Sequence, residues 1–211
     1  RGRQDPCVHQ TGLADVDSDC RLRKLMEQDQ ESGGWPCLRL SDAADTIATL
    51  SALSSGVICG ETLADGSSNC SRKMPFISST GGKVEPLGPD IFMHPPFIAP
   101  EGFVRTEGEP PGLGRVWVEY EIQLPADREA QFVSGVGLRG RHPALTSDGV
   151  TFTVTARAKD DDDSPFLIIT KHTKDYIPVP LSLDLAQLLG KRIKLRLEAS
   201  PGPAGSTDCD W

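Results

Sequence analysis

The sequence contains few hydrophobic residues and no long run of them. Only 37% of its 211 residues are hydrophobic, and 6% are aromatic. No apolar stretch approaches the ~20 residues that a membrane-spanning helix needs, so we expect no membrane span. Glycine and proline, in contrast, occur 21 and 17 times. This composition favours short strands joined by many turns over long helices.

Motifs that mark common enzyme classes are missing as well. The sequence has no Gly-x-Ser-x-Gly, His-Glu-x-x-His, Gly-x-Gly-x-x-Gly or Walker pattern. Its acidic residues mostly occupy turns or outward strand positions. Paired carboxylates for glycoside hydrolysis are brought together in space and leave no fixed spacing in the sequence, so a hydrolase stays a third alternative. We expect a protein that is not an enzyme.

A positive overall charge is also lacking. The formal net charge is -8 and the pI is near 5.0. Such a chain repels the phosphate backbone of nucleic acids unless a local basic stripe opposes the overall field. The most basic stretch, from Lys191 to Arg196, alternates charged and apolar residues, which is typical of a strand with one solvated face. We therefore expect no nucleic-acid partner.

The cysteines form an even set without a Cys-x-x-Cys pair. They are Cys7, Cys20, Cys37, Cys59, Cys70 and Cys209. Because no histidines lie at zinc-finger spacing, disulfides are a better interpretation than a zinc or redox site. We expect Cys59 to pair with Cys70, since the residues between them are rich in Gly, Ser and Asp and make a loop that closes easily. Disulfides persist outside the cytosol, which predicts a secreted, extracellular or periplasmic protein.

The chain divides into a cysteine-rich N-terminal extension over residues 1–37 and a β-domain over residues 38–211. Within the extension, a short helix is plausible from Asp19 to Gln30. A strand is expected near Val57 to Cys59.

Residues 64–115 are dominated by Gly, Pro and Ser. They are expected to form long loops with one or two short strands, near Phe76 and Phe92.

Strict alternation of apolar and polar residues begins at Val116 and predicts strands with one buried and one solvated face. In VWVEYEIQL the apolar set is Val116, Val118, Tyr120, Ile122 and Leu124. In DGVTFTVTARA it is Val150, Phe152, Val154 and Ala156. Further strands are expected in FVSGVGLRG, PFLIITK, IPVPLSLDL and KRIKLRLEA. The spacing predicts an all-β fold, an antiparallel β-sandwich whose inner faces share one core.

Several short patterns in the second half of the chain carry a resemblance through their order. They are Met93-His94-Pro95-Pro96, Asp148 to Val154, Leu189 to Leu197, and the closing Asp208-Cys209-Asp210-Trp211. From about residue 84 to 211 the chain resembles the NPCBM family of putative carbohydrate-binding modules and the related carbohydrate-binding module family 51. The resemblance implies a galactose-binding-like jelly roll, often with a structural calcium, whose loops hold the sugar. The family normally continues past the Asp-Trp element into a final strand, and the first forty residues have no counterpart in it.

Candidate ligand-binding residues follow from the needs of sugar recognition, which uses planar hydrogen-bonding groups and an aromatic face. They are His94, Asp148, Asp210, Trp211 and Trp117. Four of them have a structural alternative: His94 as a buried histidine bonded to backbone, Asp148 as a turn residue, Trp211 as a structural plug, and Trp117 as a covered side chain. Asp208 and Asp210 are candidate calcium ligands, although two carboxylates fall short of the oxygens that calcium prefers.

The leading hypothesis is a secreted, non-catalytic, glycan-binding module. The alternative is a structural or interaction subunit of an extracellular assembly, such as a filament or surface layer, in which the same sandwich contacts protein partners.

Overall fold

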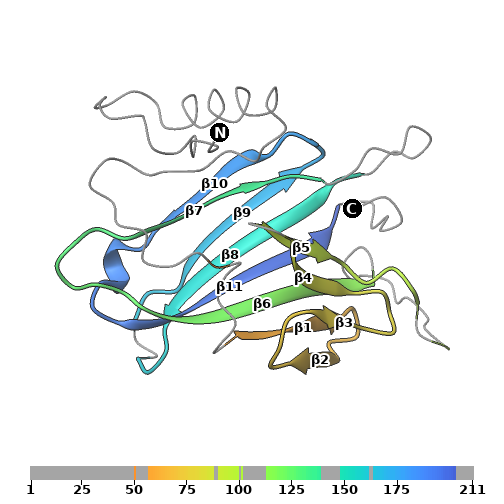
Figure 1. The fold of residues 1–211 in the computed structure, drawn as a ribbon, viewed down its shortest axis with the longest axis horizontal. Helices are drawn as coiled ribbons and strands as arrows, with labels where there is room; N and C mark the ends of the chain where they lie inside the picture. Colours follow the sequence, from red (N-terminus) through yellow and green to blue (C-terminus); the bar gives the residue numbers. More distant parts are fainter. Residues whose placement is uncertain are drawn as a thin grey trace, which may run out of the picture.

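The computed structural model describes residues 50, 57–87, 90–99, 101, 113–138, 148–161 and 164–202 (Figure 1). In chain order the strands are β1 (Val57–Leu63), β2 (Ser68–Ser71), β3 (Phe76–Ile77), β4 (Lys83–Leu87), β5 (Asp90–His94), β6 (Gly114–Gln123), β7 (Gln131–Val136), β8 (Val150–Ala158), β9 (Leu167–Thr173), β10 (Val179–Asp184) and β11 (Arg192–Pro201). A turn of 3-10 helix, η3 (Ala186–Leu188), precedes β11. The all-β expectation is confirmed. The predicted extension over residues 1–37 and its helix lie outside the described residues.

One large antiparallel sheet forms the base of the molecule. Its six strands follow the order β2-β1-β6-β11-β8-β9. The predicted alternation is confirmed on its central strand β6, where Val116, Val118 and Tyr120 are fully buried. The same alternation on β8 buries Val150 and Val154. β11 lies between these two strands and buries Leu195 and Ala199 on the same side. Because side chains opposite one another on neighbouring strands share a face, the three rows join into one apolar surface.

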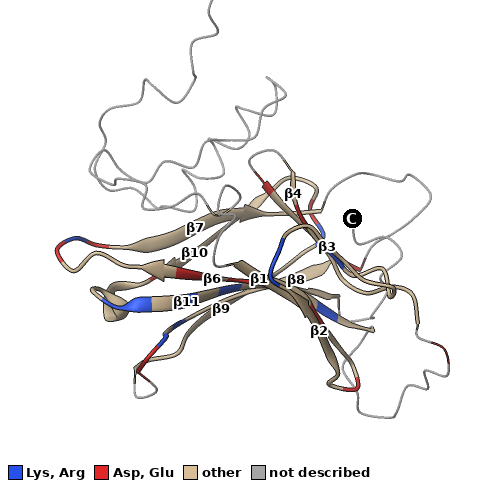
Figure 2. Cartoon of the chain, turned by 60° about the horizontal axis from the view of Figure 1, so that its bottom comes forward, with Lys and Arg blue, Asp and Glu red and all other residues tan. Residues whose placement is uncertain are grey.

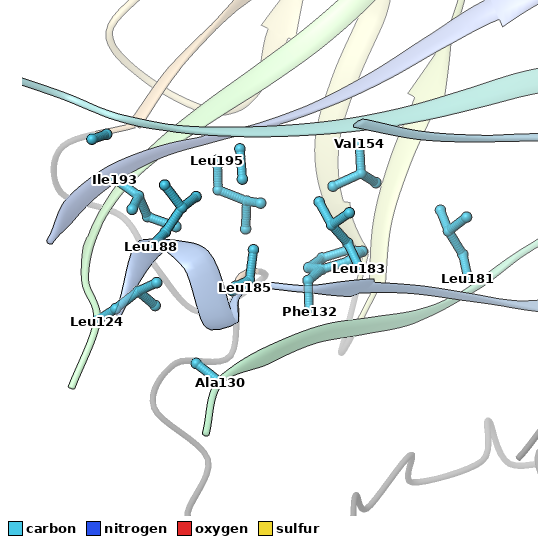
Figure 3. Close-up of a cluster of buried hydrophobic side chains, with 12 residues drawn as sticks. Leu124, Ala130, Phe132, Val154, Leu181, Leu183, Leu185, Leu188, Ile193 and Leu195 are labelled. Carbon is cyan, nitrogen blue, oxygen red and sulfur yellow. The ribbon is translucent and has the colours of Figure 1, made fainter. Parts of the chain in front are cut away.

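Two smaller antiparallel sheets cover that apolar surface. The β7–β10 pair lies above β6, β11 and β9 in the side view of Figure 2, and β4 lies above β1 and β8 at the other end. The β3-β4-β5 sheet contacts β1, β6 and β11. Phe132 of β7 and Leu183 of β10 point toward Val154 and Leu195 of the large sheet (Figure 3). At the other end, Val84 of β4 belongs to a second buried cluster with residues of β1 and β6. The large sheet therefore has one covered face and one face turned away from the core.

Residues 64–115 contain more strand than the sequence predicted. Strands near Phe76 and Phe92 are confirmed, but β2 and β4 were missed, and β3, β4 and β5 pair into a sheet of their own. Sharp turns at Gly66 and Gly81, with φ of 83° and 81°, let this glycine-rich segment fold back on itself as hairpins.

Within the described residues, no helix is long and apolar enough to cross a bilayer.

The expected Cys59–Cys70 disulfide is wrong, because both residues are free thiols in the structure. Cys59 lies opposite Ser71 in the β1–β2 ladder, and Gly60 lies opposite Cys70. Directly opposite residues share a face, so the two cysteines point to opposite sides of the hairpin. Cys59 is buried in the core, where burial raises the pKa of its thiol to about 11. The other cysteines, Cys7, Cys20, Cys37 and Cys209, lie outside the described residues.

Candidate functional site

His94 ends β5 and is buried, with 3% of its surface exposed. Its Nδ1 donates a hydrogen bond to the carbonyl oxygen of Pro95 over 2.7 Å. The ring meets Phe97 edge-on, with centroids 5.0 Å apart. Burial, and secondarily the charge of Lys83, lowers the pKa of His94. These contacts fit the alternative of a buried histidine bonded to backbone.

Trp117 points away from the core, as the alternation predicted, yet it is only 9% exposed. The guanidinium carbon of Arg196 lies 4.2 Å from the centre of its ring, in a cation–π contact. Within the described part of the chain, Nε1 of Trp117 has no hydrogen-bond partner. A sugar could stack on this indole only after Arg196 had moved aside.

Asp148 lies two residues before β8 and is followed by Gly149, whose φ of +96° marks a sharp turn. A Cβ added to Gly149 would lie 2.5 Å from the carbonyl oxygen of Thr173, so glycine is required there. Asp148 itself packs against Gly202, whose added Cβ would meet the carboxyl carbon at 2.7 Å. Its surroundings are therefore the ends of β8, β9 and β11, whereas His94 lies among residues of β4 and β5.

The remaining predicted site residues are not described by the structure. Asp208, Asp210 and Trp211 fall beyond residue 202. Among the residues that are described, no group of three or more His, Cys, Asp or Glu side chains converges as a metal site. The predicted calcium ligands therefore stay predictions from the sequence.

The face of the large sheet that points away from the core carries polar side chains that the cross-strand register brings side by side. We call it the outer face. Its residues are Arg115, Trp117, Glu119, Glu121 and Gln123 on β6, Arg192, Lys194, Arg196, Glu198 and Ser200 on β11, Thr151, Thr153, Thr155 and Arg157 on β8, and Ile168, Thr170 and His172 on β9. Charged bands on β6 and β11 are visible on this sheet in Figure 2.

Ion pairs across β6 and β11 hold the charged side chains of the outer face in place. Glu121 contacts both Lys159 and Arg192 at 2.8 Å. The hydrogen bond from Lys159, together with the neighbouring positive charges, lowers the pKa of Glu121. A carboxylate held ionised in this way suits a fixed hydrogen-bond acceptor and not a general acid.

A second carboxylate of the outer face, Glu198, is held between two arginines. Its oxygens lie 3.5 Å from Arg115 and 3.4 Å from Arg196. Arg196 is thereby fixed from two sides, by this ion pair and by the indole of Trp117 beneath it. Side chains that are already held in this way lose little further conformational entropy when a ligand binds.

Hydroxyl groups line the other half of the outer face. The hydroxyls of Thr153 and Thr170 lie 3.3 Å apart across β8 and β9. The hydroxyl of Thr151 and Nδ1 of His172 lie 3.2 Å apart at the next pair of this face along the same ladder.

An open depression lies where β8 and β11 meet the neighbouring turns. Its lining residues are Ala158, Asp160, Asp161, Lys191 and Arg192. The arrangement offers an extended, shallow surface and suits a flat or chain-like ligand.

One buried acid was not singled out from the sequence. Glu61 of β1 points into the core side and is buried, with its Oε2 accepting hydrogen bonds from the hydroxyls of Ser78 and Thr80 at 2.7 and 2.6 Å. The carbonyl of Thr80 in turn accepts from the amides of Phe97 and Ile98. Glu61 thus ties the β3–β4 turn to the large sheet, which is a structural task. The signal that the sequence offers for Glu61 is its place in VICGETL, two and four residues after the buried Cys59 and Val57 on the same side of the strand.

The fold and this surface define an antiparallel all-β protein with a covered core and an open polar sheet face. Comparison with known proteins adds no relative: no family model, no curated protein and no solved structure matches the chain.

Proposed function

We propose that this protein is a non-catalytic glycan-binding module that holds its ligand on the outer face. The observation that carries the proposal is the fixed array of hydroxyl, amide and ion-paired side chains on the adjacent strands β6, β11, β8 and β9. Sugars present many hydroxyls at fixed angles, and rigid planar partners on strands match them at low entropic cost.

An exposed apolar margin supports the same proposal. Phe166, directly before β9, and Ile168, the second residue of β9, are 60% and 57% exposed. The C–H face of a pyranose ring stacks on an aromatic surface, and Phe166 offers one beside the hydroxyl row. The proposed site therefore combines polar contacts in its centre with a stacking group at its edge.

We infer a jelly-roll sandwich of the galactose-binding-like type, which is supported by the shared core between the large sheet and the small sheets above it. An extracellular or periplasmic location and a structural calcium near Asp208 and Asp210 are also retained as proposals that rest on the sequence. Peptide mapping of disulfides that involve Cys7, Cys20, Cys37 or Cys209 tests the location. Calorimetry with calcium tests the metal site.

Affinity electrophoresis through gels that contain soluble polysaccharides tests the main proposal. We expect retardation by at least one polysaccharide, loss of it in Thr153→Leu, and retention in Ser182→Leu, where the change falls on an exposed position of β10 instead. Circular dichroism verifies that each variant is folded. No retardation by any polysaccharide contradicts glycan binding, and release of reducing ends from the panel contradicts the non-catalytic part.

A second candidate function is that of an interaction subunit in an extracellular assembly. It is favoured by a separate set of exposed apolar side chains at the β3–β4 hairpin and after β5, namely Ile77 at 66%, Ile98 at 48% and Phe97 at 39% exposure. Phe97 and Ile98 are tied to the hairpin through the carbonyl of Thr80. Clustered exposed apolar residues often mark protein contacts.

Size-exclusion chromatography with light scattering tests this candidate. Assembly that is abolished by Ile77→Ser and Ile98→Ser, but kept in the control Ile177→Ser, supports it. A wild-type chain that stays monomeric at high concentration contradicts self-assembly as its function.

A further inference from the structure

The positive charge of the outer face contrasts with the acidity of the whole chain. The face and the residue directly after β8 carry six basic side chains, Arg115, Arg157, Lys159, Arg192, Lys194 and Arg196. They carry three carboxylates, Glu119, Glu121 and Glu198. Three positive charges are thus in excess on this face, whereas the chain as a whole has a formal net charge of -8.

The excess gathers at the seam between β8 and β11. Arg157 lies directly opposite Lys194 in the ladder, and Arg192 and Arg196 are the diagonal neighbours. Directly opposite side chains have Cβ atoms only about 5 Å apart, and like charges in such pairs destabilise a sheet. Arg157 is exposed and makes no ion pair with another described residue, and Lys194 is 28% exposed with Glu119 at 3.7 Å. The seam therefore holds a repulsion that an anion would relieve.

An aromatic ring borders this cationic seam. The β8–β9 ladder ends with Ala156 opposite Leu167, so the next residue of β8, Arg157, lies beside Phe166, the residue directly before β9. Phe166 is among the most exposed large apolar side chains of the described residues. On the neighbouring position of the same face, Thr155 adds a hydroxyl between Arg196 and Ile168. Two cationic side chains, Arg157 and Lys194, thus lie close to the hydroxyl of Thr155 and the aromatic ring of Phe166.

From this juxtaposition we propose that the seam binds an acidic glycan, a carbohydrate chain bearing carboxylate or sulfate groups. The inference rests on the proposed function and names the ligand class for it. The anionic group lies between Arg157 and Lys194, where a guanidinium fork can bind two oxygens at once. The apolar side of the same sugar rests against Phe166.

The spacing of negative charges distinguishes an acidic glycan from nucleic acid as the expected ligand. Duplex DNA carries about one charge per 1.7 Å, and its binding surfaces present long stripes of unpaired Lys and Arg. Here most basic side chains already share carboxylates of the same face, such as Glu121 and Glu198. The few positive charges left over match the wider spacing of charges along an acidic polysaccharide.

Binding to a polyuronate, a sulfated galactan and a neutral galactan, measured by calorimetry at 50 and 500 mM NaCl, tests the inference. We expect an acidic polymer to bind at least tenfold more tightly than the neutral one, and high salt to weaken that binding about tenfold or more. The uronate and sulfate arms distinguish which anionic group is preferred. Arg157→Gln should weaken acidic-glycan binding by about tenfold or more, as expected for a lost hydrogen bond to a charged group.

The control variant Arg128→Gln removes the same charge from the exposed turn before β7 and should leave binding within twofold of wild type. Phe166→Ala should weaken binding, whereas Ile177→Ala, at another exposed apolar position, should not. Equal binding of acidic and neutral glycans, or equal effects of Arg157→Gln and Arg128→Gln, overturns the inference while glycan binding itself stands. Binding of single-stranded DNA as tightly as of any acidic glycan also overturns it. Absence of binding to every glycan defeats the proposed function instead.

Discussion

Replacing Leu188 with alanine tests the core that joins the layers. Leu188 sits on η3 and is fully buried in the cluster shared by β7, β10 and the large sheet (Figure 3). The substitution removes three side-chain carbons from a site enclosed by side chains such as Leu124 and Ile193, which belong to separate strands or turns. Leucine-to-alanine changes at such sites cost about 2–5 kcal/mol, through lost burial and the cavity left behind.

For a chain of this size, each kcal/mol lowers Tm by about 2–4 °C, so we expect Leu188→Ala to lower it by about 10 °C. Differential scanning calorimetry measures the shift. Gln187→Ala is the matched control, because its side chain is exposed on the same turn. A shift of Leu188→Ala no larger than that of the control would show that η3 does not pack into the core, and would refute the layered arrangement at this end.

Three further predictions concern buried polar groups. Tyr120→Phe should leave the free energy of unfolding unchanged or raise it by up to about 1 kcal/mol, because the buried hydroxyl has no hydrogen-bond partner among the described residues. Urea titration measures this free energy, and a clear loss of stability in the variant contradicts the packing. Iodoacetamide at pH 8 should modify Cys70 quickly and Cys59 only on unfolding, since Cys59 is buried with a pKa raised to about 11. Equal rates of modification of the two thiols in the native protein argue against the burial of Cys59. Burial lowers the pKa of His94, so its contribution to stability is present above its ordinary pKa and is lost as pH falls below about 6.5, where the unfolded state gains the proton. His94→Gln should flatten the fall in Tm between pH 7 and 5, and an unchanged slope contradicts the assignment.

The faces of single strands could be predicted from the sequence because the two-residue period is local. Val116, Val118 and Tyr120 were assigned inward and Trp117 outward, and all four positions are confirmed. A one-residue error would have exchanged the faces, so the alternation fixed each strand's orientation toward the core.

Cross-strand register was not predictable in the same way. The opposition of Arg157 and Lys194 depends on which strands pair and in what register, and neither is encoded in a local pattern. The same limit produced the error at Cys59 and Cys70, where a short loop suggested a disulfide but the ladder places the side chains on opposite faces. β3 and β5 were predicted, but β4, which joins them into one sheet, was missed because it is short and contains a proline, a residue that is rare in strand interiors.

Mapping the binding surface by NMR tests directly whether a glycan binds at the seam between β8 and β11. Amide signals of the isotope-labelled protein are compared with and without the acidic polysaccharide that binds most tightly. We expect the perturbed amides to lie on β8, β9 and β11, centred on Arg157 and Lys194, while those of β7 and β10 stay unchanged. Perturbations confined to the surroundings of His94 and Asp148, with none along β8 and β11, would contradict it.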